Sequence, residues 1–207
     1  MRELDIRISK ALSRIYLENP FIGSPLTKLP FEEVDHPAID TFATDGKSIL
    51  YNKKFLDTLS QDDVRFVIVH EVLHVILLHH VRRNNRHATL WNVACDFAIN
   101  LMVNDMLKIS PPKGGLLDRK YEGMGAEEIY ESLLKDAKDN KNGKGKGGNN
   151  GEGGEYGDYT DIGGFIEPSE FDKDEAERNA KDMASEAVVY AKTMGKDIPG
   201  SIEKMIG

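Results

Sequence analysis

The sequence is poor in cysteine: Cys95 is the only one among 207 residues, so no internal disulfide can form. Residues 1–20 mix charged with apolar side chains and lack the uninterrupted apolar core of a signal peptide. No stretch approaches the roughly 20 consecutive apolar residues that span a bilayer. Because nothing points to an oxidising compartment or to a membrane, we expect a cytoplasmic protein.

Basic residues are also in the minority. The chain has 27 Lys and Arg against 35 Asp and Glu, which gives a net charge of −8. Nonspecific nucleic-acid binding depends on clustered Lys and Arg. The charge balance therefore argues against nucleic acid as the main partner.

Apolar residues are scarce between residues 136 and 159, where Gly, Lys and Asn dominate. Such a composition buries too little apolar surface to offset the entropy lost on ordering, so it predicts a flexible insertion. The sequence contains no internal repeat, and a chain of this size can bury about 70% of its unfolded surface around one core. We therefore expect a single domain over residues 1–207 with an insertion at 136–159.

The spacing of the apolar residues predicts an α+β fold with a small sheet. The turn Asp45-Gly46 separates two short runs and tolerates positive φ, which is typical of a hairpin. Ser60 is suited to begin a long helix that is apolar nearly all round and should therefore be buried. The predicted helices cover residues 4–17, 60–82, 89–107, 126–135 and 169–195.

The sequence HEVLH lies within the predicted helix 60–82 and contains His70, Glu71 and His74. Residues four apart share a helix face, so both imidazoles can reach one Zn²⁺ ion while Glu71 lies beside it. In such a site zinc activates a water and Glu71 acts as general base, which is the chemistry of amide hydrolysis. The alternative is a buried helix with two hydrogen-bonded histidines, but burying three ionisable groups without a metal is costly.

The third ligand has three candidates: His79, His80 and Asp96. On an unbroken helix His79 points about 160° and His80 about 100° away from the mean direction of the first two histidines. His80 has the spacing of the third histidine in metzincins, but those proteins turn the chain at a glycine, and Leu77 stands there. Asp96 lies in the next helix among apolar residues, and two packed helices would bring it to the ion. We therefore predict His70, His74 and Asp96 as the metal ligands.

Asn100 follows Asp96 by one helical turn. Its amide could bond the outer nitrogen of a ligand histidine and so fix the orientation of the ring. It could equally be an amide on the helix surface. Cys95 points about 100° from the Asp96 face, as expected of a small core residue.

The segments ATDGKSILYN, HEVLHVILLHH, WNVACDFAIN and YEGMGAEEIYESL resemble a metallopeptidase domain family that occurs with MoxR-type AAA ATPases. That resemblance implies a zincin-like fold, with His70, His74 and Asp96 as ligands and Glu71 as general base. It also implies an AAA ATPase as a partner. Members often continue into a von Willebrand A-like domain, for which this sequence has no counterpart.

Together these features predict a zincin-like α+β domain that hydrolyses peptide bonds in a peptide or protein substrate with Zn²⁺. The alternative is a noncatalytic module in which the metal joins two helices and the surface binds an AAA ATPase. A purely structural site has no use for Glu71, which favours the peptidase.

Overall fold

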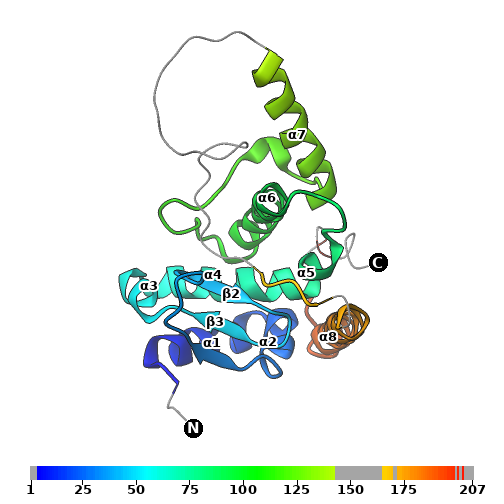
Figure 1. Cartoon of the computed structure of the whole chain (residues 1–207). Helices are drawn as coiled ribbons and strands as arrows, with labels where there is room; N and C mark the ends of the chain where they lie inside the picture. Colours follow the sequence, from blue (N-terminus) through cyan, green and yellow to red (C-terminus); the bar gives the residue numbers. More distant parts are fainter. Residues whose placement is uncertain (1–3, 143–164, 170–171, 199, 201, 203–207) are drawn as a thin grey trace.

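The computed structural model describes residues 4–142, 165–169, 172–198, 200 and 202. Within these residues the fold is a mixed α+β arrangement of helices around a three-stranded sheet (Figure 1), as predicted. The elements are, in chain order, α1 Ile6–Glu18, α2 Pro20–Leu26, β1 Phe31–Glu33, β2 Phe42–Thr44, β3 Ile49–Tyr51, α3 Lys53–Thr58, α4 Gln61–Ile76, α5 His79–Arg82, α6 Ala88–Leu107, the 3₁₀ helix η1 Arg119–Tyr121, α7 Ala126–Asn142 and α8 Lys173–Thr193.

The sheet has the order β1-β3-β2, in which β1 is parallel and β2 antiparallel to β3. The predicted hairpin is therefore confirmed as β2 and β3. Gly46 has a φ of +81° in its turn, and a Cβ there would lie 2.7 Å from His80 Nε2. Glycine at this position serves both the turn and the close approach of α5. The order leaves β2 at one edge of the sheet.

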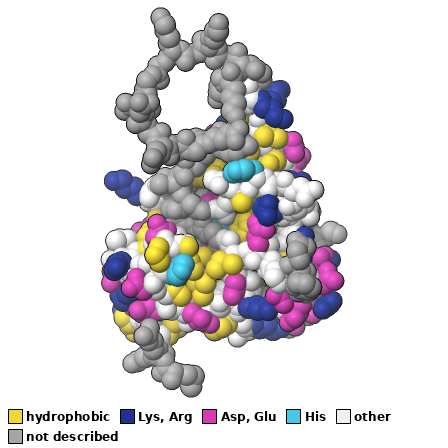
Figure 2. All heavy atoms as spheres, viewed as in Figure 1, with side chains coloured by type: hydrophobic (Ala, Val, Ile, Leu, Met, Phe, Trp, Pro, Cys, Tyr) yellow, Lys and Arg dark blue, Asp and Glu magenta, His cyan; other side chains and the backbone are white. Residues whose placement is uncertain are grey.

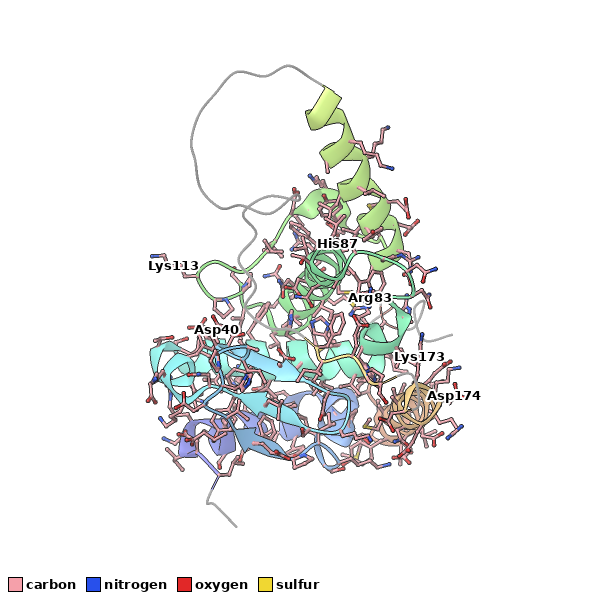
Figure 3. All side chains as sticks on the ribbon, in the orientation of Figure 1. Asp40, Arg83, His87, Lys113, Lys173 and Asp174 are labelled. Atoms are coloured by element: carbon pink, nitrogen blue, oxygen red, sulfur yellow. The ribbon has the colours of Figure 1, made fainter. Side chains whose placement is uncertain are left out.

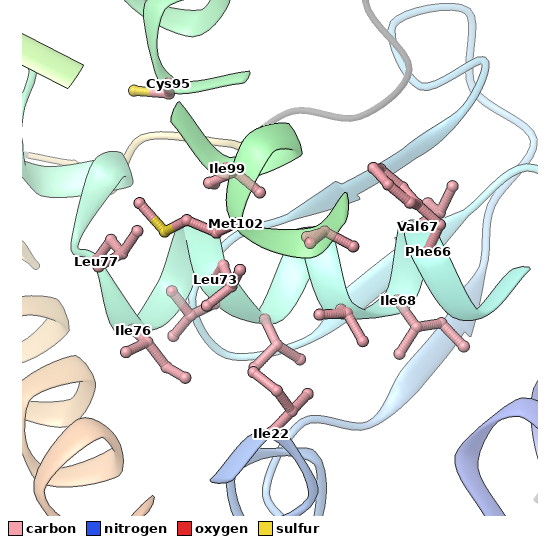
Figure 4. Close-up of a cluster of buried hydrophobic side chains, with 14 of the residues drawn as sticks. Ile22, Phe66, Val67, Ile68, Leu73, Ile76, Leu77, Cys95, Ile99 and Met102 are labelled. Carbon is pink, nitrogen blue, oxygen red and sulfur yellow. The ribbon is translucent and has the colours of Figure 1, made fainter. Parts of the chain in front are cut away.

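The centre of the fold is α4, which packs against α1, α2, α6, α8 and β2. Its start is fixed by a capping box: the Ser60 hydroxyl accepts a hydrogen bond from Asp63 N–H, and the Asp63 carboxylate accepts one from Ser60 N–H. Every residue of α4 from Val64 to Ile76 is buried. Figure 4 shows apolar side chains of this helix meeting Ile22 on one side and Ile99 and Met102 on the other. Apolar residues all round the helix are thus explained by neighbours all round it.

The prediction of one continuous helix over residues 60–82 is wrong. It ends at Ile76, and α5 begins at His79 after Leu78 adopts a left-handed backbone with φ 56° and ψ 29°. A bulky residue rarely adopts this conformation, and the local sequence gives no sign of it. Arg82 stabilises the break, since its Nη1 donates to the Leu77 carbonyl at 2.7 Å and its guanidinium pairs with Glu127 of α7. Tertiary contacts outweigh the local helix preference here.

The helix predicted at 89–107 is confirmed as α6, and it packs against α4 on one side and α7 on another. Helix α7 extends to Asn142, beyond the predicted end at residue 135. The first part of the predicted insertion, residues 136–142, is therefore helical. Four of these seven residues are Asp or Asn, which favour a helix less than Lys and Ala do, but adding a residue to an existing helix costs less than starting one. The rest of the predicted insertion lies outside the described residues.

The last predicted helix is confirmed as α8, which docks mainly on α2 and also contacts α4 and α5. Its buried stripe consists of small residues and one methionine: Ala176, Ala180, Met183, Ala184, Ala187 and Ala191.

Acidic and basic side chains are interspersed over the face shown in Figure 2. Among the helices of the described residues, none is both long and apolar enough to cross a membrane.

Candidate metal centre

His70 and His74 lie one turn apart on α4, and both are fully buried. Their Nε2 atoms are 2.9 Å apart. Asp96 of α6 directs Oδ1 at both, at 3.5 Å from His70 Nε2 and 3.4 Å from His74 Nε2. The packing of α6 on α4 thus brings together the three residues that the sequence analysis named as ligands.

The spacing of these three atoms fits one small ion. In a tetrahedral zinc site with bonds of about 2.0 to 2.2 Å, neighbouring ligand atoms are about 3.3 Å apart. The three observed separations, 2.9, 3.4 and 3.5 Å, lie close to that value. Two imidazoles and one carboxylate are also a donor set that zinc accepts, and three protein ligands leave a fourth position for water or substrate. The residues present therefore fit a Zn²⁺ ion.

Asn100 fixes which nitrogen of His70 is available. Its Nδ2 donates to the Leu116 carbonyl at 2.8 Å, so its Oδ1 is the atom that faces His70 Nδ1, also at 2.8 Å. Because an amide oxygen only accepts, His70 Nδ1 carries the proton and its Nε2 lone pair faces the other two ligand atoms. Of the two interpretations of Asn100, the structure favours the orienting amide over the surface amide, since Asn100 is fully buried.

His79 lies beside His74 much as Asn100 lies beside His70. Its Nδ1 lies 3.2 Å from His74 Nδ1, and both side chains are buried. If His74 presents Nε2 to a metal, His74 Nδ1 carries the proton and donates to His79. The Trp91 indole of α6 in turn donates to the His79 carbonyl at 3.1 Å. The sequence analysis missed this contact, because it assumed an unbroken helix in which His79 points away.

Burial sets the protonation of the cluster. Loss of solvent lowers the pKa of His74 from 6.5 to about 4, although Asp96 opposes the change. Burial alone would raise the pKa of Asp96, but the adjacent His70 and His74 outweigh it and hold that pKa below its ordinary value. At neutral pH, His74 is therefore neutral and Asp96 is ionised. Those are the forms that bind metal.

Glu71 follows His70 on α4 and is fully buried. Its side chain leaves the helix about 80° from the mean direction of the two histidines. Glu71 is not among the three residues whose ligand atoms converge, which are His70, His74 and Asp96 in the described part of the chain.

His80 lies elsewhere, with its Nε2 at the turn between β2 and β3, where it approaches Gly46. The group of three His, Cys, Asp or Glu residues with converging ligand atoms in the described part of the chain consists of His70, His74 and Asp96. The turn after α4 thus brings His79 to His74 and directs His80 toward the hairpin.

In a comparison with protein families, residues 4–206 match the model of a family described as a putative metallopeptidase domain. The chain belongs to this family. No curated protein and no solved structure matched the chain.

Proposed function

We propose that this protein is a zinc-dependent peptidase with a zincin-like HExxH site. The observation that carries the proposal is the buried convergence of His70 Nε2, His74 Nε2 and Asp96 Oδ1, all within 3.5 Å of one another. The family match supports a metallopeptidase. Zinc is the metal proposed because it favours a tetrahedral site of nitrogen and oxygen ligands with one position open.

Zinc bound there would acidify a water and polarise the carbonyl of the scissile bond. The residues of the chain supply the rest. Glu71 accepts a proton from the attacking water and returns it to the leaving amine nitrogen. Asn100 and His79 hold the two imidazoles in the required tautomers. The surrounding apolar residues of α4 and α6 exclude bulk water, which strengthens each of these interactions.

Peptides are the proposed substrates because α4, which carries both histidines, packs against the edge strand β2, and an edge strand can pair with an extended chain. An AAA ATPase partner is part of the proposal and rests on the sequence resemblance. Such a partner could deliver protein substrates to the site. The cytoplasmic location is likewise inferred from the sequence.

Replacing Glu71 by Gln tests the proposal. The amide is nearly the same size but cannot take up the proton, so zinc content and fold should be retained while peptidase activity is lost. Glu122→Gln is the matched control, since Glu122 is 61% exposed and lies outside the cluster. Cleavage of a peptide library by zinc-loaded protein is the measurement.

Equal cleavage by the native protein and Glu71→Gln would contradict the catalytic role. If zinc binds but the native protein cleaves no peptide and instead retains an AAA ATPase, the noncatalytic module gains support.

A further inference from the structure

The edge of β2 is paired with a segment from far along the chain. Phe165 forms a parallel bridge with Thr44, the last residue of β2, and Ile166 N–H donates to the Thr44 carbonyl at 2.7 Å. In Figure 1 the segment 165–169 passes beside β2 toward the start of α8. We call residues 165–167 the edge segment. It takes the position on β2 that another extended chain would use.

Two side chains fix the edge segment on either side of this hydrogen bond. The ring of Phe165 lies against the ring of His74, with 5.2 Å between the centroids. Glu167 pairs with the guanidinium of Arg83, which follows α5, and Nη2 is 2.8 Å from Oε2. Figure 3 places Arg83 near the junction of α5 and α6. The edge segment thus presents an aromatic ring to a metal-ligand candidate and a carboxylate to Arg83.

The edge segment makes few contacts, so another peptide can exchange with it. Ile166, between the two anchors, leaves 43% of its surface exposed. The side chains of Arg83 and Glu167 are 29% and 33% exposed, and ion pairs in contact with solvent contribute little. A groove of about 360 Å³ continues along the same edge, lined in part by Phe42 and Ala43 of β2 and by Asn92 and Val93 of α6. There is space beside the edge segment for further residues of an extended chain.

We propose that the β2 edge, the ring face of His74 and Arg83 form a peptide-binding site that the edge segment occupies in exchange with substrate. The site favours an extended peptide with an aromatic residue two positions before a carboxylate, the pattern of Phe165 and Glu167. As a statement about substrates this inference rests on the proposed peptidase function. Peptide binding can nevertheless be measured without catalysis.

The edge segment also limits access to the site. A ligand that binds only when the segment is displaced has its apparent affinity reduced by the fraction of molecules in which the site is open. Weakening the segment should therefore strengthen binding of the same sequence added as a separate peptide.

The test uses a fluorescent peptide with the sequence FIEPS, residues 165–169, and the full chain in zinc-loaded and metal-free forms. Ile166→Pro removes the N–H that bonds Thr44, while Ile166→Ala retains it and serves as the matched control. Fluorescence anisotropy should show the peptide binding about tenfold more tightly to Ile166→Pro than to the native protein or to Ile166→Ala. Peptides AIEPS and FIQPS should bind more weakly.

A second pair of variants tests Arg83 separately. Arg83→Gln should abolish the preference for FIEPS over FIQPS, whereas Arg119→Gln should retain it, because Arg119 pairs with Asp105 and Glu122 elsewhere. Equal peptide affinity in Ile166→Pro and Ile166→Ala, with unchanged circular dichroism, would overturn the proposal. A preference for glutamate that survives Arg83→Gln would also overturn it. Peptide binding without cleavage would instead count against the peptidase function alone.

Discussion

Replacing Asp96 by Asn should weaken zinc binding and so reduce the stability that zinc adds to the protein. Asp96 is 1% exposed, and its Oδ1 lies 3.5 and 3.4 Å from the Nε2 atoms of His70 and His74. Without zinc, His70 and His74 more than offset the desolvation of the buried carboxylate, as its lowered pKa shows, so the amide should also cost the metal-free protein some stability. With zinc, the same amide is a weaker ligand than the carboxylate. The substitution should therefore destabilise the zinc-loaded protein more than the metal-free protein.

The size of the effect follows from the role of Asp96 as a direct ligand. Replacing a residue that only orients a ligand lowers metal affinity about 10 to 100-fold. Replacing a ligand itself should therefore lower it about 100-fold or more. At a zinc concentration that saturates the native protein, this removes about 2.7 kcal/mol of stabilisation. For a chain of this size we therefore expect the zinc-induced rise in Tm to be about 5 to 10 °C smaller.

Thermal unfolding with and without zinc, after removal of bound metal by a chelator, measures this difference. Asp105→Asn is the matched control, because Asp105 lies on the same helix with a side chain that is 49% exposed. A zinc-induced rise in Asp96→Asn equal to the native one would refute the reasoning. An equally large reduction of the zinc-induced rise in Asp105→Asn would also refute it.

Further predictions concern the residues around the cluster. Asn100→Ala should lower zinc affinity about 10 to 100-fold in a competition titration, and His79→Leu should do the same, while His79→Gln, which retains an acceptor, should lose less. Gly46→Ala should reduce the free energy of unfolding by about 1 to 3 kcal/mol in urea, because it strains φ and crowds His80. The pKa of His74 is 6.5 in the unfolded chain and about 4 in the fold. The unfolded chain therefore takes up a proton first, and urea unfolding of the metal-free protein should show stability falling as the pH drops from about 6.5 toward 4. Zinc affinity equal to that of the native protein in the Asn100 and His79 variants would contradict the first argument. Unchanged stability in Gly46→Ala would contradict the second, and a free energy of unfolding that does not change with pH would contradict the third.

The sequence predicts most of the elements because their signals are local. The Asp45-Gly46 turn, the Ser60 cap and the apolar spacing of α6 each act over a few residues. Packing of α6 on α4 then brings Asp96 to the histidines. This could be predicted from the sequence because two apolar helices are expected to lie side by side.

What the sequence did not reveal depends on long-range contacts. The left-handed Leu78 breaks α4 where no glycine or proline marks a turn, and tertiary contacts such as the ion pair of Arg82 with Glu127 of α7 hold it. The contact of His79 with His74 follows from that break. Phe165 reaches His74 from a segment that has no periodic pattern of its own. The metal ligands, the general base and the cytoplasmic location remain predictions.

The central claim is that one zinc ion is held by His70, His74 and Asp96. Anomalous diffraction at the zinc edge from crystals of zinc-loaded protein tests it most directly. The account predicts one peak per chain within about 2.0 to 2.2 Å of His70 Nε2, His74 Nε2 and an Asp96 carboxylate oxygen. A fully loaded crystal with its zinc bound at His80, or with no peak among these three residues, would contradict it.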